Sequence, residues 1–220
     1  MVKIVCVSDT HSLHNQLEIP KCDLLIHAGD FSGWGKYEDV FFINKWFGKL
    51  KENEIAKEII LIAGNHDGWV EQYPGLAKEE LKNCIYLNEE SCELFGFRIF
   101  GSPFSPEFNN WHFMAERGKE IARHWSKIPD DTQILVVHGP PYGILDVNTE
   151  EIYSQPLGPE HLGCEDLRKR IDQLKNLKLL VTGHIHSSSG IEEHNGVKFV
   201  NASVLNESYE VIYQPRVIEL

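Results

Sequence analysis

The sequence predicts an α/β fold built around a mostly parallel β-sheet. Short apolar runs without alternation recur along the chain, as in strands that are covered on both faces. A segment with helical periodicity separates the second run from the third, which gives the β, α, β order of parallel strands with a crossover helix. The 220 residues, 42% hydrophobic and 25% charged, have the composition of a globular protein, and we expect a single domain over residues 1–220.

Each element follows from a local pattern. The expected strands are KIVCVSD, DLLIHAGD, EIILIAGNHD, QILVVHGPP and KLLVTGHIH, all rich in Val, Ile and Leu. Helices are expected over residues 35–53, 111–129 and 164–177. Antiparallel hairpins are expected in SCELFGFRIFGSP and in SGIEEHNGVKFVNAS, the second with an Asn-Gly turn. Residues 140–163 are expected to form a long functional loop.

The net charge of the chain disfavours some classes of binding partner. A charge of −12 repels nucleic acid backbones and anionic membrane surfaces, so we expect neither a nucleic acid polymer nor a membrane as partner. A small anionic substrate would need local positive charge, which cations held by the 11 histidines and 33 acidic residues could supply. The five cysteines contain no CxxC pair, and no stretch has the pattern of a signal peptide or a membrane span, so a reducing, cytoplasmic location is expected.

Polar side chains that can bind metal follow all five strand-like runs. Carboxyl ends of parallel strands share one edge of a sheet, so we expect a single site there. Its members are Asp9 and His11, Asp30, Asn65 and His66, His138, and His184 and His186. Carboxylate and amide oxygens and neutral imidazoles suit Mn, Fe and Zn. A lone histidine at a strand end is more often structural, and Asp9 could cap a turn, but the combination favours a metal site.

These residues resemble the calcineurin-like metallophosphoesterases, whose pattern is D-x-H, GD, GNH followed by D or E, H, and GHxH. All five blocks occur here in that order. The stretches HAGDFSGWG, GFRIFGSPFSPEFNNWHF, HGPPYGILD and VNAS are also similar to the metallophosphoesterase-domain subfamily, which includes brain-type metallophosphodiesterases. The similarity runs from Val2 to almost the end of the chain.

The resemblance implies two packed mixed β-sheets flanked by helices, with two divalent metal ions, Mn, Fe or Zn, at one edge. One ion would be held by Asp9, His11, Asp30 and His186. The other would be held by Asp30, Asn65, His138 and His184, so that Asp30 is shared. His66, with Asn65, would contact the substrate phosphate and protonate the leaving group, and Asp67 would orient His66.

The activity implied by the resemblance is hydrolysis of small phosphodiesters, including cyclic nucleotides, by water whose pKa two cations lower. The choice of diester rests on the subfamily likeness alone. A phosphomonoesterase, a nuclease and a noncatalytic scaffold are the alternatives. All seven predicted ligands and His66 are present, which disfavours the scaffold, and the chain lacks the basic stripe of a nuclease. The chain reads GDFSGW where many members have GDxxDR, so an arginine phosphate clamp is not expected.

Other histidines and aromatic residues carry simpler expectations. His27 lies inside an apolar run and should belong to the core. Five histidines should face solvent: His14, His112, His124, His161 and His194. The aromatic residues of 104–113 could line a pocket for a nucleobase or aryl group, or pack their loop on the sheets. No sequence feature indicates an oligomeric state.

Overall fold

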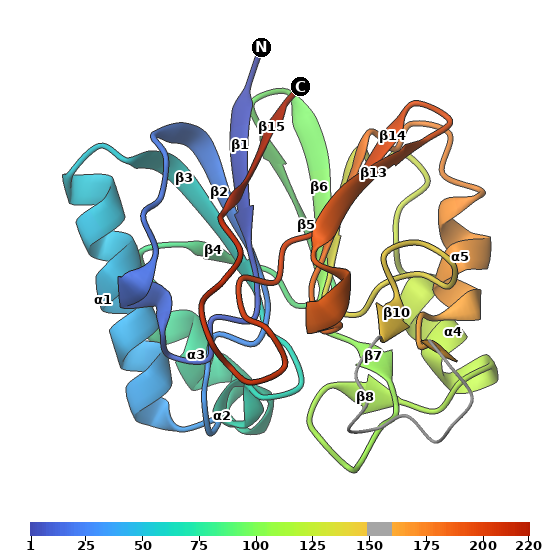
Figure 1. Ribbon diagram of the computed structural model, residues 1–220, viewed down its shortest axis with the longest axis horizontal. Coiled ribbons are helices and arrows are strands. Elements are labelled where there is room, and N and C mark those ends of the chain that lie inside the picture. The colour runs from blue at the N-terminus through green and yellow to red at the C-terminus, as the bar shows by residue number, and fades with distance from the viewer. Residues whose placement is uncertain (149–159) are drawn as a thin grey trace.

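Two mixed β-sheets pack face to face in the computed structural model, which describes residues 1–148 and 160–220 (Figure 1). The first sheet has the order β15-β1-β2-β3-β4. Its strands are β1 (Lys3–Val7), β2 (Cys22–Ala28), β3 (Ala56–Ile62), β4 (Ile85–Tyr86) and β15 (Arg216–Glu219). Strands β1 to β4 are parallel to one another, and β15 pairs with β1 in the antiparallel direction. The predicted β, α, β unit is therefore confirmed.

The second sheet has the order β13-β14-β12-β9-β6-β5. Its strands are β5 (Glu90–Leu94), β6 (Phe97–Ser102), β9 (Ile134–Val137), β12 (Leu179–Thr182), β13 (Gly190–His194) and β14 (Val197–Asn201). The four inner strands are parallel, and both edges are the antiparallel hairpins predicted from the sequence. Asn195 and Gly196 both have positive φ in the turn between β13 and β14, as an Asn-Gly turn requires.

Apolar side chains of each central strand are buried on both faces. In β1, Ile4 and Cys6 belong to the core between the two sheets, whereas Val5 and Val7 belong to the core beneath the helices. Strands with two buried faces need no polar residue at alternate positions, which explains the continuous apolar runs in the sequence.

Helices cover the outer face of each sheet (Figure 1). Helix α1 (Tyr37–Glu52) packs on the first sheet, followed by the short helices α2 (Gly68–Gln72) and α3 (Pro74–Glu80). Helices α4 (Lys119–Trp125) and α5 (Glu165–Ile171) pack on the second sheet. Two 3₁₀ turns are present, η1 (His14–Gln16) and η2 (His186–Ser188).

The helix predicted over residues 111–129 is wrong for its first part. Residues Met114–Ala115 form strand β8, which pairs with β7 (Ser105–Pro106). Phe113 and Gly118 have positive φ, which no α-helix accommodates, so α4 begins only at Lys119. The third predicted helix is also shorter than expected, because α5 ends at Ile171. Helices α2 and α3 were not predicted.

The expected functional loop is described only in part. Strands β10 (Val147–Asn148) and β11 (Glu160–His161) pair within it, and residues 149–159 lie outside the described residues. All five cysteines are free thiols. Among residues 1–148 and 160–220, none of the helices combines the length and hydrophobicity that a bilayer span requires.

Candidate metal centre

The predicted ligands converge at the carboxyl ends of strands from both sheets. Asp9 and His11 follow β1, Asp30 follows β2, Asn65 and His66 follow β3, His138 follows β9, and His184 and His186 follow β12. Within the part of the chain that the structure describes, three groups of side chains have potential ligand atoms within 4.8 Å of one another. They are Asp9, His11 and His186; His11, Asp30 and His66; and Asp30, His138 and His184. The groups overlap, so they form one continuous cluster.

Asp9 anchors one half of this cluster. Its Oδ1 lies 3.5 Å from His186 Nε2. Ser203 Oγ donates a hydrogen bond of 2.6 Å to Asp9 Oδ2, and the backbone N–H of His184 lies 3.0 Å from both carboxylate oxygens. The carboxylate is completely buried and held from several sides, so its orientation is set before any ligand binds.

Asp30 lies between the two halves. Its Oδ2 is 3.8 Å from His11 Nε2 and 3.3 Å from His138 Nε2. Its Oδ1 accepts a hydrogen bond of 2.7 Å from the backbone N–H of His66. His138 Nε2 also lies 3.0 Å from Asn65 Oδ1. A single carboxylate oxygen thus faces imidazoles from both sides, the position a shared ligand would need.

Backbone carbonyls orient three of the imidazoles. The Nδ1 atoms of His11, His138 and His186 lie 3.0, 2.9 and 3.1 Å from the carbonyl oxygens of Ser32, Ala28 and Asn206, respectively. Donation from Nδ1–H to a carbonyl leaves the Nε2 lone pair facing the carboxylates, as is typical of metal-binding histidines. His11 Nε2 is buried and has no hydrogen-bond partner. These residues therefore fit divalent metal ions in both donor type and orientation.

The electrostatics keep both carboxylates ionised. Burial acts to raise the pKa of Asp9 and of Asp30, but neighbouring imidazoles, chiefly His186 for Asp9 and His138 for Asp30, hold both well below the usual range. Burial acts to lower the pKa of His138 and of His186, yet the carboxylates raise each to about 9. Without metal, the positive charges of His138 and His186 thus balance the negative charges of Asp9 and Asp30. Bound metal ions would supply that positive charge instead.

The backbone is strained where the ligands leave their strands. Asp9, His11, Asp30 and His184 have φ values of 54°, 38°, 52° and 70°. For residues other than glycine this left-handed conformation costs on the order of 1–3 kcal/mol each. Such residues persist only where the surrounding structure fixes their conformation, and four of them lie in this one cluster.

We expect Gly183→Ala to displace Asp9. A Cβ at Gly183 would clash with Ser8 Oγ and Asp9 Oδ2, which are buried and cannot withdraw. Overpacking of this kind costs about 1–3 kcal/mol of unfolding free energy, and the displaced carboxylate should also weaken metal binding. Urea unfolding and elemental analysis measure the two effects. Gly75→Ala is the control, because a Cβ there meets nothing within 4 Å. Parental stability and metal content for Gly183→Ala would contradict the prediction.

The carboxyl group of Asp67 accepts hydrogen bonds from backbone groups, whereas the resemblance implies that it orients His66. Its Oδ1 accepts a hydrogen bond of 2.9 Å from the backbone N–H of Ser32, and its Oδ2 accepts one of 2.7 Å from that of Gly64. Burial and the charge of Asp30 raise the pKa of Asp67 to about 8. The carboxyl group therefore joins the loops after β2 and β3, and His66 Nδ1 is buried without a hydrogen-bond partner.

Two aromatic residues near the cluster were not predicted as site residues. The Trp111 ring lies 4.1 Å from the His66 ring, centroid to centroid. The Tyr209 ring lies 4.9 Å from that of His11 and 5.7 Å from that of His186. Trp111 belongs to the aromatic stretch for which two interpretations were open. Tyr209 follows no recognisable motif, so the sequence carried no signal for it.

Three histidines outside the cluster are buried or partly buried. His27 is buried and its Nε2 lies 3.0 Å from Thr10 Oγ1, which confirms its place in the core. The prediction that His14 faces solvent is wrong, because it is buried with its ring 5.2 Å from that of Trp46. His124 is also partly buried and stacks on Phe104 at 3.5 Å.

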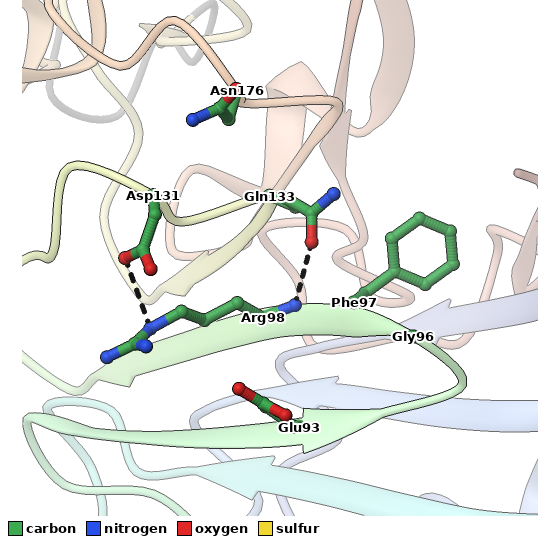
Figure 2. A pocket seen from close by; sticks show the side chains of 7 residues that line it. All are labelled: Glu93, Gly96, Phe97, Arg98, Asp131, Gln133 and Asn176. Atoms are coloured by element: carbon green, nitrogen blue, oxygen red, sulfur yellow. Dashed lines mark hydrogen bonds and ion pairs between the residues drawn. The ribbon is translucent and has the colours of Figure 1, made fainter.

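A separate pocket lies at the opposite end of the second sheet (Figure 2). Its lining comes from the end of β5, the start of β6, and the loops before β9 and β12: Glu93, Gly96, Phe97, Arg98, Asp131, Gln133 and Asn176. The Arg98 side chain pairs with Asp131, and its backbone N–H donates to Gln133 Oε1. His138 follows the other end of β9, so this pocket is not part of the cluster.

Comparisons with known proteins agree with the composition of the cluster. The calcineurin-like phosphoesterase family model matches residues 2–188, which contain every predicted ligand. The chain is 34% identical to human metallophosphoesterase domain-containing protein 1, over 99% of this chain and 71% of that protein. It is 33% identical to a UPF0046 protein of Caenorhabditis elegans, over 100% of this chain and 81% of the relative.

Among solved structures, an archaeal phosphodiesterase is similar over 98% of this chain and 99% of that chain, with 17% identity and a TM-score of 0.47. The family assignment therefore rests on the sequence matches and not on this structural similarity.

Proposed function

Because the chain belongs to the calcineurin-like phosphoesterase family, we propose that it is a metal-dependent phosphodiesterase that hydrolyses small phosphodiesters, including cyclic nucleotides. The family assignment makes the chain a phosphoric ester hydrolase that uses divalent metal ions. The proposal adds the substrate class and the use of two ions. It rests on one observation above all, the position of Asp30 between His11 and His138.

Two metal ions would share Asp30 in this proposal. The first would be held by Asp9, His11, Asp30 and His186, and the second by Asp30, Asn65, His138 and His184. When bound, divalent ions supply Lewis acidity to the ester and lower the pKa of water toward neutrality. Two carboxylates against two divalent ions leave an excess of positive charge, so the cluster would attract an anionic ester although the protein carries a net charge of −12.

The chain's own groups would then bind and protonate the substrate. Asn65, a neutral ligand, adds coordination without cancelling positive charge. His66 would contact the phosphate and donate a proton to the oxygen of the leaving group. Its Nδ1 is the enclosed ring nitrogen, so the proton would leave from Nε2. Manganese, iron and zinc all suit this set of oxygen and imidazole ligands.

We propose a small phosphate ester as the partner of this site and the cytoplasm as the location of the protein. The five free cysteines support a reducing compartment. The charge of −12 disfavours binding to a nucleic acid polymer or to an anionic membrane.

A substrate panel tests the proposal. The protein is stripped with a chelator, reconstituted with Mn, Zn or Fe, and assayed with cyclic nucleotides, linear diesters, monoesters and oligonucleotides. We expect up to two ions per chain, a higher melting temperature after reconstitution, and kcat/KM for small diesters at least about tenfold above that for monoesters, equivalent to about 1.4 kcal/mol.

The chelated protein is the control in each assay. Turnover that does not depend on added metal would exclude the metal mechanism. A preference for monoesters or for oligonucleotides would instead favour one of the alternative substrate classes on the same fold. Absence of all hydrolysis with two ions bound would favour the noncatalytic scaffold.

A further inference from the structure

We propose that Trp111 positions the imidazole of His66 for proton donation, and that Glu71 holds Trp111 in place. This inference rests on the proposed function of His66 as the proton donor. It assigns positioning roles to two residues outside the ligand set.

Ring contacts, rather than hydrogen bonds, determine the orientation of His66. Its Nδ1 has no partner, and Asp67 is engaged with the backbone of Ser32 and Gly64. The Trp111 indole lies against the His66 ring, with centroids 4.1 Å apart and an interplanar angle of 31°. The His11 ring meets His66 edge-on, at 4.5 Å and 82°. The imidazole is thus held by the indole and by one predicted metal ligand.

Glu71 connects the loop between β7 and β8, which contains Trp111, to the segment that contains His66. Its Oε1 accepts a hydrogen bond of 2.7 Å from the backbone N–H of Phe113, and its Oε2 lies 2.8 Å from Nδ1 of His112. The backbone N–H of His112 also donates to the carbonyl of Asn65, at 3.2 Å. Both residues that follow Trp111 are therefore joined to the segment that runs from Asn65 to Glu71.

Close packing reinforces this attachment. A Cβ at Gly68 would clash with the His112 ring, so the absence of a side chain at this position lets the loop approach α2. Trp111 is 41% exposed. An indole that exposed is not part of the hydrophobic core.

The expected chemistry depends on the leaving group. As the oxygen of water bonds to phosphorus and the bond from phosphorus to the leaving oxygen breaks, a proton passes from His66 Nε2 to that leaving oxygen. An alkoxide needs this proton, because it is a strong base. A nitrophenolate is stable as an anion and can leave without it. Disorder of His66 should therefore slow the hydrolysis of alkyl esters and spare that of nitrophenyl esters.

Kinetics of single variants and one double variant test the proposal with the reconstituted enzyme. We expect Trp111→Ala and Glu71→Ala to lower kcat on an alkyl diester by roughly ten- to a hundredfold, and kcat on a nitrophenyl diester by less than about threefold. Trp111→Phe keeps an aromatic ring against His66 and should retain most of the parental activity on the alkyl diester. Phe42→Ala is the matched control, an exposed aromatic residue of α1, and should match the parent on both esters. In a His66→Asn background, Trp111→Ala should have no further effect on the alkyl ester.

An NMR measurement on the metal-free protein tests the geometry without activity. The ring protons of His66, assigned by their absence in His66→Asn, should be shifted upfield by the Trp111 indole. They should move downfield in Trp111→Ala and stay in place in Phe42→Ala. Unchanged His66 signals in Trp111→Ala would overturn the proposal.

The kinetic outcomes separate this inference from the function on which it rests. If His66→Asn slows the alkyl ester but Trp111→Ala and Glu71→Ala do not, the positioning role is wrong while the proposed function stands. Equal slowing of both esters by Trp111→Ala would also overturn it, because a general structural defect does not distinguish leaving groups. If His66→Asn itself hydrolyses both esters at the parental rate, proton donation by His66 is wrong, and the positioning role with it. If Trp111→Ala does not fold, the same comparison of kcat on the two esters is made with Glu71→Ala and Trp111→Phe.

Discussion

Asp30→Ala should abolish phosphoester hydrolysis and reduce the metal content of both halves of the site. Its Oδ2 faces His11 on one side and His138 on the other, so removal of the carboxylate takes a ligand from each ion. Loss of a residue that only orients a ligand costs about 10- to 100-fold in affinity or activity, and loss of a shared ligand should exceed that. Elemental analysis and turnover of the reconstituted protein measure the two effects.

The controls for Asp30→Ala separate metal binding from folding. Asp23→Ala removes a carboxylate at the other end of β2, where Asp23 pairs with Lys57 at 2.6 Å, and should retain both metal and activity. Asp30→Asn keeps the shape of the side chain and an acceptor for the His66 N–H, so it should fold like the parent and still lose activity. Retention of two ions by Asp30→Ala would show that Asp30 is not the shared ligand.

His66→Asn should leave the metal content unchanged and slow turnover by about 10²- to 10⁴-fold, the usual contribution of general acid catalysis. The reason lies in the geometry of the loop after β3. Asn65 Oδ1 points toward His138 Nε2, whereas the His66 ring packs against Trp111 and the edge of His11. The two neighbouring side chains therefore contact different partners, and we expect only Asn65 to bind metal.

The measurement for His66→Asn is kcat on an alkyl diester beside elemental analysis of the same sample. His194→Asn, an exposed histidine of the β13–β14 hairpin, is the matched control and should behave like the parent. Turnover at the parental rate would remove His66 from the reaction. Loss of metal together with turnover would instead place His66 among the ligands, since it can approach His11 and Asp30.

Local patterns in the sequence determined the central strands and the polar residues that end them. Strands such as β2 are buried on both faces, and the continuous apolar run from Leu24 to Ile26 is typical of such a strand. Asp9, Asp30 and His138 follow such runs, and a parallel arrangement is enough to place them at one edge. The family resemblance, carried by the same residues, added the second sheet and the division of the ligands between two ions.

Contacts between distant segments were decided only by the tertiary structure. The carbonyl of Asn206 orients His186, Ser203 holds Asp9 across 194 residues of sequence, and Trp111 lies against His66. No local pattern encodes these partners, because they meet only when the two sheets pack together.

The errors of the sequence-based predictions have the same origin. The helix expected from residue 111 has apolar residues at helical spacing, yet pairing of β8 with β7 and the hydrogen bonds of Glu71 hold that segment extended. The family resemblance implied that Asp67 orients His66, but the carboxyl group of Asp67 accepts hydrogen bonds from the backbone of Ser32 and Gly64. Periodicity and spacing report which face of an element is buried and which residues share it. The partner of each buried polar group depends on how the elements pack, and packing is a property of the whole chain.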